Sequence, residues 1–231
     1  MAIVRKHRSK VREVRRILPD VYTVRFESMD RSFQYRPGQF LHLALDPYDA
    51  TQPWPESRCF SIQSPPAKSE RILDISFSTK GVFTRRMADE LAPDGEVCLK
   101  MPYGDLLDVD CANAACVFIA GGTGLTPFLS LFLDESFGRF ANVALYLGVR
   151  NSSYHVFSAE LAQAQRTNSA FAVEVFHEDS QGRIPIDRVL AKHGKDAVYF
   201  ISGPPVMIRT FRDRLLAAGV SVEQIRTDDW E

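Results

Sequence analysis

The sequence predicts two domains of different classes, an all-β domain followed by an α/β domain built on a doubly wound parallel sheet. As far as about residue 107, short runs of alternating apolar and polar residues are separated by turn residues. Beyond about residue 108, apolar strands alternate with helical segments. A length of 231 residues suffices for two small packed cores. We expect the domains to span residues 1–108 and 109–231.

Short strands and turns fill the first half. Residues 21–26 alternate as in a half-buried strand, a turn is expected at 36–39, a second alternating run covers 41–45, and the proline-containing stretch 46–56 is expected to be a loop. The remaining elements expected here are strands at 58–63, 73–78 and 96–100 and a helix at 84–91. This pattern is typical of an antiparallel barrel or sandwich.

Strands and helices alternate in the second half. The expected strand and helix pairs are 116–120 with 127–135, 143–149 with 158–165, 171–176 with 186–193, and 197–201 with 206–218. The strands are nearly continuous apolar runs, as expected for a parallel sheet that is buried on both faces.

A glycine loop follows the first of these strands at residues 121–124. Thr126 is expected to be the N-cap of the next helix and Pro127 its first residue. Unpaired amides and the positive end of the helix dipole then form an anion site, for which a diphosphate is the usual occupant. Pro127 stands where the standard dinucleotide fingerprint has its last glycine, so an ordinary tight turn is the alternative.

Composition and charge narrow the class of protein. A net charge of −1, with 45% hydrophobic and 25% charged residues, indicates a soluble globular protein and gives no reason to expect nucleic-acid binding. No signal peptide or membrane-spanning run is visible, so a cytoplasmic location is expected. The four cysteines form no CxxC pair, and we expect neither a metal site nor a disulfide.

Basic residues crowd the N-terminus, with only Glu13 opposing them. They are Arg5, Lys6, Arg8, Lys10, Arg12, Arg15 and Arg16. One interpretation is a docking arm for an acidic partner or a membrane surface. The other, which we favour, is a solvated tail and a first strand.

Short motifs on both sides of the expected boundary occur in an order that resembles the ferredoxin–NADP reductase family of flavoproteins, over nearly the whole chain. The motifs are Arg58-Cys59-Phe60-Ser61, Gly81-Val82-Phe83-Thr84, Pro102-Tyr103-Gly104, Gly121-Gly122-Thr123-Gly124, Gly148-Val149-Arg150 and Ser202-Gly203-Pro204-Pro205. The resemblance implies a Greek-key antiparallel β-barrel that binds flavin, followed by an α/β domain that binds NAD(P).

For the first domain, the resemblance implies a flavin site built from the first two motifs. Arg58 would hold the flavin diphosphate, Phe60 would stack on the isoalloxazine ring, and Ser61 would offer its hydroxyl to flavin N5. Thr84 and the turn that begins at Gly81 would complete the diphosphate cradle. Relatives usually have Tyr at the position of Phe60, so one hydrogen bond to the flavin is absent here.

For the second domain, the resemblance implies that residues 121–124 and Thr126 hold the nucleotide diphosphate. Ser202, where relatives commonly have Cys, would lie beside the transferred hydride, in the turn that continues through Gly203 and Pro204. NADP-dependent relatives have a Ser-Arg pair after residues 171–176, whereas this chain has Glu178, so NADH is favoured over NADPH.

Two further candidates belong to the nucleotide site and the C-terminus. Arg150 is found in relatives of both nucleotide preferences and does not decide between them. Near the C-terminus, Trp230 is a candidate cover for the flavin and Asp229 a candidate acid, with a frayed terminus as the alternative.

The expected activity is transfer of hydride from NAD(P)H to FAD, favoured over FMN, and then of single electrons to a separate iron–sulfur, flavin or haem protein. Arg5, Lys6 and Arg8 would contact that partner if it is acidic. We expect the chain itself to be a monomer. The alternatives are a flavoprotein subunit of a larger complex and a non-catalytic nucleotide-binding scaffold.

Overall fold

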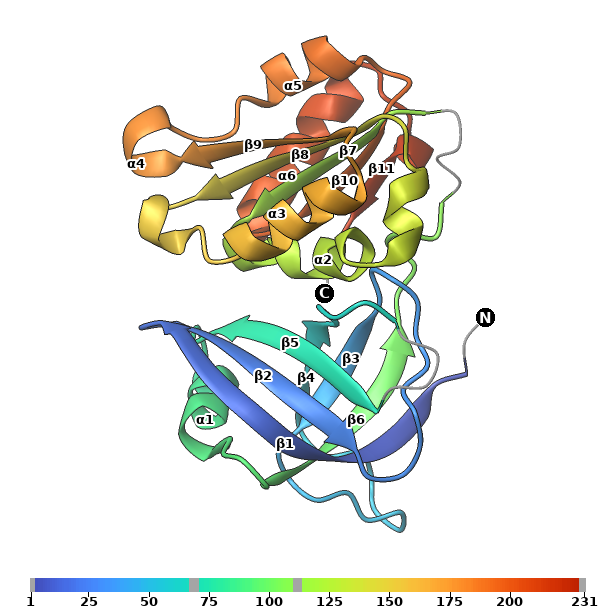
Figure 1. Cartoon of the computed structure of the whole chain (residues 1–231), viewed down its shortest axis with the longest axis vertical. Helices are drawn as coiled ribbons and strands as arrows, with labels where there is room; N and C mark the ends of the chain where they lie inside the picture. The colour runs from blue at the N-terminus through green and yellow to red at the C-terminus, as the bar shows by residue number, and fades with distance from the viewer. Residues whose placement is uncertain (1–2, 67–70, 110–113, 229–231) are drawn as a thin grey trace. The chain divides into compact units, whose positions relative to one another are not determined.

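The computed structural model describes residues 3–66, 71–109 and 114–228. The chain divides into two compact units, Met1–Asp105 and Leu106–Glu231 (Figure 1). The predicted domain boundary lies just beyond this division.

In the described part of the first unit, six strands form one antiparallel sheet in the order β4-β3-β6-β1-β2-β5. The strands are β1 (Arg5–Leu18), β2 (Val21–Ser28), β3 (Phe40–Ala44), β4 (Ser57–Ser61), β5 (Ile72–Ser78) and β6 (Glu96–Tyr103). The two edge strands meet, because the backbone N–H of Gln63, just after β4, donates to the Asp74 carbonyl of β5 at 2.9 Å. The predicted antiparallel barrel is therefore confirmed.

The barrel core forms because alternate residues of each strand point inward. Val24 and Phe26 of β2 are fully buried there, together with Leu41 and Leu43 of β3. Helix α1 (Val82–Glu90) adds Phe83 and Met87, which are four residues apart and lie on one face of the helix. It begins at Val82 rather than at residue 84.

The basic N-terminal stretch is a strand. β1 pairs antiparallel with β2 on one side and with β6 on the other. Arg5, Lys6 and Arg8 pair with β6, so they are part of the barrel wall rather than of a free arm, and their contact with an acidic partner stays a prediction. The first-strand interpretation is confirmed.

In the described part of the second unit, five parallel strands follow the order β11-β10-β7-β8-β9. They are β7 (Cys116–Gly121), β8 (Val143–Val149), β9 (Phe171–His177), β10 (Val198–Ser202) and β11 (Ile225–Thr227). The α-helices are α2 (Thr126–Phe132), α3 (Ser158–Thr167), α4 (Glu178–Gln181), α5 (Ile186–His193) and α6 (Pro205–Ala217). Short 3₁₀ turns occupy Gly122–Leu125, Glu135–Arg139, Ser152–Tyr154 and Val222–Gln224.

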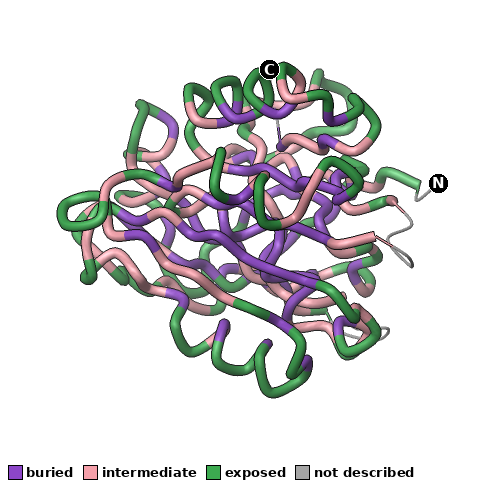
Figure 2. The backbone as a smooth tube through the Cα atoms, turned by 90° about the horizontal axis from the view of Figure 1, so that it is seen from above, coloured by how far each residue is buried: buried purple, intermediate pink, exposed green. Residues whose placement is uncertain are grey.

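Both faces of this sheet are covered. Phe118 of β7 packs with α2 and α3, whereas Val117 and Ile119 pack with α5 and α6, and Figure 2 shows the buried residues along the strands. From β7 the chain moves to β8 and β9 on one side and returns to β10 on the other. Such a reversal of strand order forms a crevice at the carboxyl ends of the strands, where ligands bind in open α/β sheets. Among the described residues, no helix is long and apolar enough to cross a membrane.

Candidate functional site

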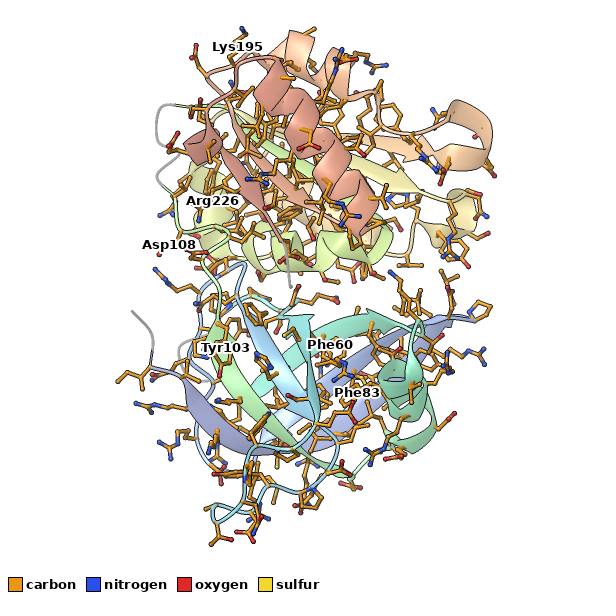
Figure 3. All side chains as sticks on the ribbon, turned by 180° about the vertical axis from the view of Figure 1, so that it is seen from behind. Phe60, Phe83, Tyr103, Asp108, Lys195 and Arg226 are labelled. Carbon is orange, nitrogen blue, oxygen red and sulfur yellow. The ribbon has the colours of Figure 1, made fainter. Side chains whose placement is uncertain are left out.

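The first candidate region lies where β4 faces β5. β4 is an edge strand of the sheet, paired with β3, and the half-buried ring of Phe60 meets the ring of Phe77 edge to face, with centroids 6.2 Å apart. Figure 3 labels Phe60 on β4 and Phe83 on α1. We call the place where β4 meets β5 the barrel seam. Phe60, the predicted stacking residue, lies at this seam, where a planar group can contact its aromatic ring.

Arg58 lies two residues earlier on the same strand and is exposed. Its guanidinium pairs with the Glu56 carboxylate at 2.8 Å, donates to the Ser57 carbonyl at 2.8 Å and sits 5.2 Å from the centroid of the Phe83 ring. The cation is thus held beside the N-terminal turn of α1. An ion pair this exposed is weak, so an anionic ligand can replace Glu56 at little cost.

The turn that opens α1 suits an anion. The Thr84 hydroxyl oxygen accepts hydrogen bonds from the backbone N–H of Lys80 at 2.9 Å and of Gly81 at 3.0 Å, which fixes the turn. A Cβ placed on Gly81 would meet nothing within 4 Å, and the side chain of Val82 is 77% exposed. The first-turn amides of the helix have no intrahelical partner and remain available. Thr84 itself acts by organising these amides.

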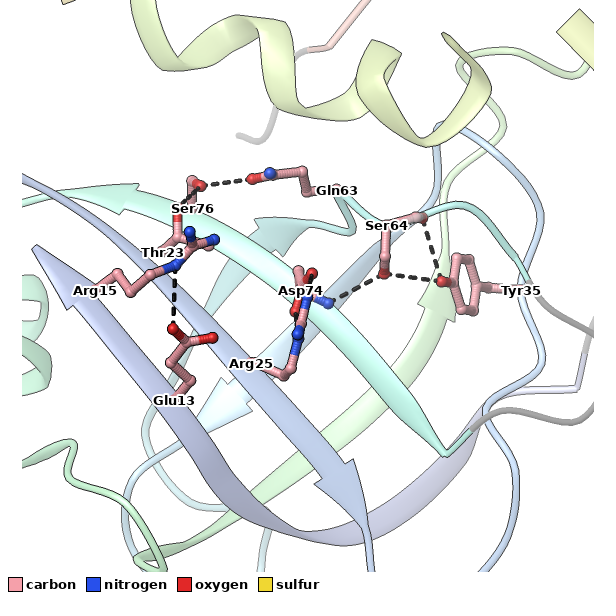
Figure 4. Close-up of polar contacts among 9 residues, drawn as sticks. All are labelled: Glu13, Arg15, Thr23, Arg25, Tyr35, Gln63, Ser64, Asp74 and Ser76. Carbon is pink, nitrogen blue, oxygen red and sulfur yellow. Dashed lines mark hydrogen bonds and ion pairs between the residues drawn. The ribbon is translucent and has the colours of Figure 1, made fainter. Parts of the chain in front are cut away.

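A buried polar network holds the chain just after Ser61. The Ser76 hydroxyl donates to the Gln63 side-chain oxygen at 2.5 Å and shares a hydrogen bond of 2.7 Å with the Thr23 hydroxyl (Figure 4). All three of these side chains are buried. The network fixes the end of β4, so Ser61 has a defined backbone position opposite Phe40 of β3.

Cys59 lies on the other face of β4 from Phe60, because neighbouring side chains of a strand point to opposite sides. It is directly opposite His42 of β3, with its sulfur 3.6 Å from the His42 Nε2. The backbone of Cys59 therefore lies beside Phe60 at the seam, whereas its side chain points to the opposite face of the strand.

The second candidate region begins with the glycine loop after β7. The loop is wound into the 3₁₀ turn Gly122–Leu125, which runs directly into α2. Thr126 is therefore not the N-cap: it is the first residue of α2, and its hydroxyl donates to the Thr123 carbonyl at 2.9 Å. The cap prediction failed because the loop coils by itself, with Gly122 at a φ of +56°. The unpaired amides consequently begin in the turn rather than in α2.

The loop after β7 is interlocked with the turn after β10. A Cβ on Gly124 would lie 2.5 Å from the Ser202 carbonyl oxygen and 2.6 Å from the Gly203 Cα, so the two backbones touch. A Cβ on Gly121 would lie 2.7 Å from Pro204 Cδ. A Cβ on Gly122, by contrast, would meet nothing within 4 Å. The loop is therefore packed on one side and open on the other, as a diphosphate cradle requires.

Ser202 ends β10 and faces a buried acid. Its hydroxyl donates to the Asp228 carboxylate at 2.8 Å, and the two residues are 2% and 8% exposed. Asp228 is held there because its backbone N–H donates to the Ile201 carbonyl at 2.9 Å. Sequence reasoning passed over Asp228 because the short strand β11 that precedes it went unrecognised. Asp229 and Trp230 lie outside the described residues.

The third candidate region lies at the carboxyl ends of β8 and β9. The Asp179 backbone N–H donates to the Arg150 carbonyl at 3.1 Å, which joins the two ends. The Arg150 guanidinium donates to the Tyr154 hydroxyl at 3.2 Å and lies 4.9 Å from that ring's centroid. The Glu178 carboxylate accepts a hydrogen bond of 2.8 Å from Arg183. The acid predicted to select the nucleotide therefore has a cation beside it.

The chain is similar in sequence to several known oxidoreductases. Residues 118–213 match the oxidoreductase NAD-binding domain family. The flavohemoprotein of Rhizobium meliloti (strain 1021) is 29% identical over 83% of this chain and 51% of its own length. The reductase component DmpP of phenol 2-monooxygenase from Pseudomonas sp. (strain CF600) is 30% identical over 58% of this chain and 36% of its own length.

Among solved structures, a ferredoxin NADP⁺ reductase from Neisseria gonorrhoeae with bound FAD and NADP has the same fold. It matches with a TM-score of 0.78 and 19% identity, over 96% of this chain and 98% of that chain. The chain thus spans about half or less of the length of the two curated relatives, and nearly all of this structure. The barrel, the doubly wound sheet and these matches define a class of two-unit oxidoreductases. The chain is similar to ferredoxin–NADP reductases and flavohemoproteins, and residues 118–213 carry an oxidoreductase NAD-binding domain.

Proposed function

We propose that the chain is a flavin-dependent NAD(P)H oxidoreductase that passes electrons from a reduced pyridine nucleotide, through FAD, to a separate protein. The main support for this proposal is the close contact of Gly124 with the backbone of Ser202 and Gly203, at the place where the strand order of the parallel sheet reverses. The nucleotide would lie in a cradle formed jointly by the loop after β7 and the turn after β10.

The first unit, extended to residue 108, would bind FAD. Arg58 and the first-turn amides of α1 provide positive charge and hydrogen-bond donors for the diphosphate. Phe60 provides a ring at the seam for stacking, and Ser61 provides a hydroxyl at the end of β4. When bound, flavin supplies the ability to take up hydride and release electrons one at a time. The family likeness supports FAD over FMN, since the Neisseria reductase contains FAD.

The second unit, from residue 109, would bind the nucleotide. The amides of the 3₁₀ turn at Gly122–Leu125 would hold the diphosphate on the open side of the loop. Ser202, held by Asp228, would lie against the nicotinamide ring and fix its position. The buried Asp228 carboxylate keeps the Ser202 hydroxyl in one orientation, so that its oxygen lone pairs face away from the acid.

NADH is the preferred donor in this proposal. The Glu178 carboxylate suits the free 2′-hydroxyl of NADH and repels the 2′-phosphate of NADPH. Arg183, 2.8 Å from Glu178, weakens that repulsion, so the preference is modest.

The acceptor is proposed to be an iron–sulfur or haem protein. The named relatives support this choice, since one is a flavohemoprotein and another is the reductase component of a monooxygenase.

Anaerobic titration of the flavin-loaded protein with NADH, and then of a fresh sample with NADPH, tests the proposal. The visible flavin absorbance is expected to bleach at lower concentrations of NADH than of NADPH. Failure to bind flavin after reconstitution would identify the chain as a non-catalytic scaffold. Bleaching without turnover of any acceptor would favour a subunit of a larger complex, and bleaching by NADPH alone would overturn the role of Glu178.

A further inference from the structure

Part of the positive charge on β1 is neutralised within the barrel wall by ion pairs of three arginines. Arg8 pairs with Glu96 at 3.2 Å, Arg12 pairs with Glu27 and Asp94, and Arg15 pairs with Glu13 at 3.4 Å. The basic character that is prominent in the sequence is therefore partly cancelled at Arg8, Arg12 and Arg15.

The beginning of the strand is different. Lys6 of β1 lies directly opposite Lys100 of β6 in the antiparallel register. Among the residues that the structure describes, neither lysine forms an ion pair with a carboxylate. Like charges directly opposite each other on neighbouring strands repel, and this arrangement costs stability. Two like charges thus face each other at Lys6 and Lys100.

Aromatic rings surround the two ammonium groups. The Lys6 Nζ lies 4.0 Å from the centroid of the Tyr48 ring, and the Lys100 Nζ lies 5.9 Å from the centroids of both Trp54 and Tyr103. Tyr48 and Trp54 belong to the loop at residues 46–56, and their rings are 5.3 Å apart. The acids of that loop are engaged elsewhere: Asp46 pairs with Arg86, Asp49 accepts hydrogen bonds from Thr51, and Glu56 pairs with Arg58.

We call Lys6, Tyr48, Trp54, Lys100 and Tyr103 the aromatic–basic patch. It combines two features of protein interfaces, tyrosine and tryptophan rings at the centre and charge that is unmatched within the free protein. Charge complementarity favours an acidic partner, because carboxylates would relieve the repulsion between the two lysines.

The aromatic–basic patch connects to the seam by a short series of contacts. The Tyr103 ring, labelled in Figure 3, meets the His42 ring edge to face at 4.8 Å, and the sulfur of Cys59 lies 3.6 Å from His42 Nε2. Cys59 stands between Arg58 and Phe60 on β4. The patch is therefore linked, through Tyr103, His42 and Cys59, to the strand that carries Arg58 and Phe60.

We propose that the aromatic–basic patch is the docking surface for the acidic protein that accepts electrons from this chain. The proposal rests on the proposed function, and it replaces the N-terminal arm with a fixed face of the barrel.

The test is NADH-driven reduction of an acidic [2Fe–2S] ferredoxin by the flavin-loaded double variant Lys6→Glu/Lys100→Glu. The matched control, Lys195→Glu/Arg212→Glu, makes the same change in net charge on the second unit. We expect the double variant to raise the KM for ferredoxin about tenfold or more at about 0.05 M salt, and much less at about 0.5 M salt. Carbodiimide cross-linking of the wild type is expected to join ferredoxin carboxylates to Lys6 or Lys100.

Reduction of 1,4-benzoquinone, a small uncharged acceptor, separates the two proposals. A wild type that fails to reduce it with NADH contradicts the proposed function. Normal quinone reduction with an unchanged ferredoxin KM in the Lys6/Lys100 variant overturns the docking surface. Three further results would also overturn the docking surface. They are an equal rise of the ferredoxin KM in the control variant, cross-links confined to other residues, and the absence of salt-sensitive binding of ferredoxin by the wild type. Patch-dependent binding to phosphatidylglycerol vesicles that equals or exceeds binding to ferredoxin would overturn it as well.

Discussion

The Ser202 hydroxyl donates a hydrogen bond of 2.8 Å to the Asp228 carboxylate, and both side chains are buried. A hydrogen bond to a buried charge is worth about 1.5–3 kcal/mol, and removing the donor leaves the carboxylate undersatisfied. Ser202→Ala is therefore expected to lower the free energy of unfolding by about 1–3 kcal/mol and to slow reduction of the flavin by NADH. Thermal denaturation and stopped-flow absorbance measure the two effects. Ser153→Ala, at an exposed site, is the control, and equal losses in both variants would contradict the prediction.

Gly124 is expected to be the least replaceable residue of its loop. Gly124→Ala would drive a Cβ to 2.5 Å from the Ser202 carbonyl oxygen, and backbone atoms cannot rotate away. Gly122→Ala has open space but a φ of +56°, which costs an alanine about 1–2 kcal/mol. We expect Gly124→Ala to raise the KM for NADH far more than Gly122→Ala. Similar KM values for the two variants would show that the clash is absorbed elsewhere.

The pairing of Glu178 with Arg183 makes nucleotide preference adjustable in both directions. Glu178→Gln removes the carboxylate and is expected to raise kcat/KM for NADPH relative to NADH. Arg183→Ala leaves Glu178 uncompensated and is expected to shift the ratio towards NADH. Arg188→Ala, which breaks an ion pair with Glu174 on β9, serves as the control. A ratio that moves no further in these variants than in the control would remove Glu178 from the site.

Flavin affinity is expected to depend on the Arg58 cation and to tolerate a change of Phe60 that keeps its ring. Arg58→Ala removes the cation beside α1 and should weaken FAD binding about tenfold or more, a loss of about 1.4 kcal/mol or more. Phe60→Tyr keeps the ring and should bind FAD at least as tightly as the wild type. Quenching of flavin fluorescence measures both. Arg85→Ala, on the exposed side of α1, is the control, and FAD affinity equal to the wild type in Arg58→Ala would sink the assignment.

Stability is expected to fall when the pH drops below about 6.5. Burial lowers the pKa of His7, His42, His155 and His193 in the folded chain. The unfolded chain then binds more protons than the folded chain, so the stabilisation present above about pH 6.5 is lost as the pH falls towards the folded-state values. Acidic side chains with lowered pKa, such as Asp46 and Asp187, titrate below pH 3.8 and do not act in this window.

Melting temperatures between pH 7.5 and pH 5 measure this effect. His7→Gln removes the most buried of these imidazoles and is expected to flatten the pH dependence, even where the variant is less stable throughout. A wild type with no acid destabilisation in this range would contradict the assignment.

The fold was predictable because the spacing of apolar residues along the sequence follows directly from which side of each strand or helix is buried. The strand at 143–149 and the helix at 186–193 were predicted with the bounds that the structure has. The failures occurred where local signals compete with tertiary packing. Thr126 has the side chain of an N-cap, yet the glycines before it coil into a 3₁₀ turn. β11 is only three residues long, too short for any periodicity, and without it the burial of Asp228 could not be foreseen.

The sequence was enough to predict the motifs of the site, but not which residues of different motifs contact each other. Gly124 and Ser202 stand out in the sequence, whereas their contact depends on β7 and β10 being neighbours in the sheet. Likewise the sequence shows a basic N-terminus, but it takes the register of β1 against β6 to place Lys6 opposite Lys100. Which charges remain uncompensated is a property of strand pairing.

The interlocked turns also set a rule for engineering. A loop transplanted from another reductase to alter nucleotide use would carry its own Cβ atoms and curvature into the space that Ser202 and Gly203 fill. The stretches 121–125 and 202–205 therefore behave as one module, and chimeras that exchange both together should fold where single exchanges fail.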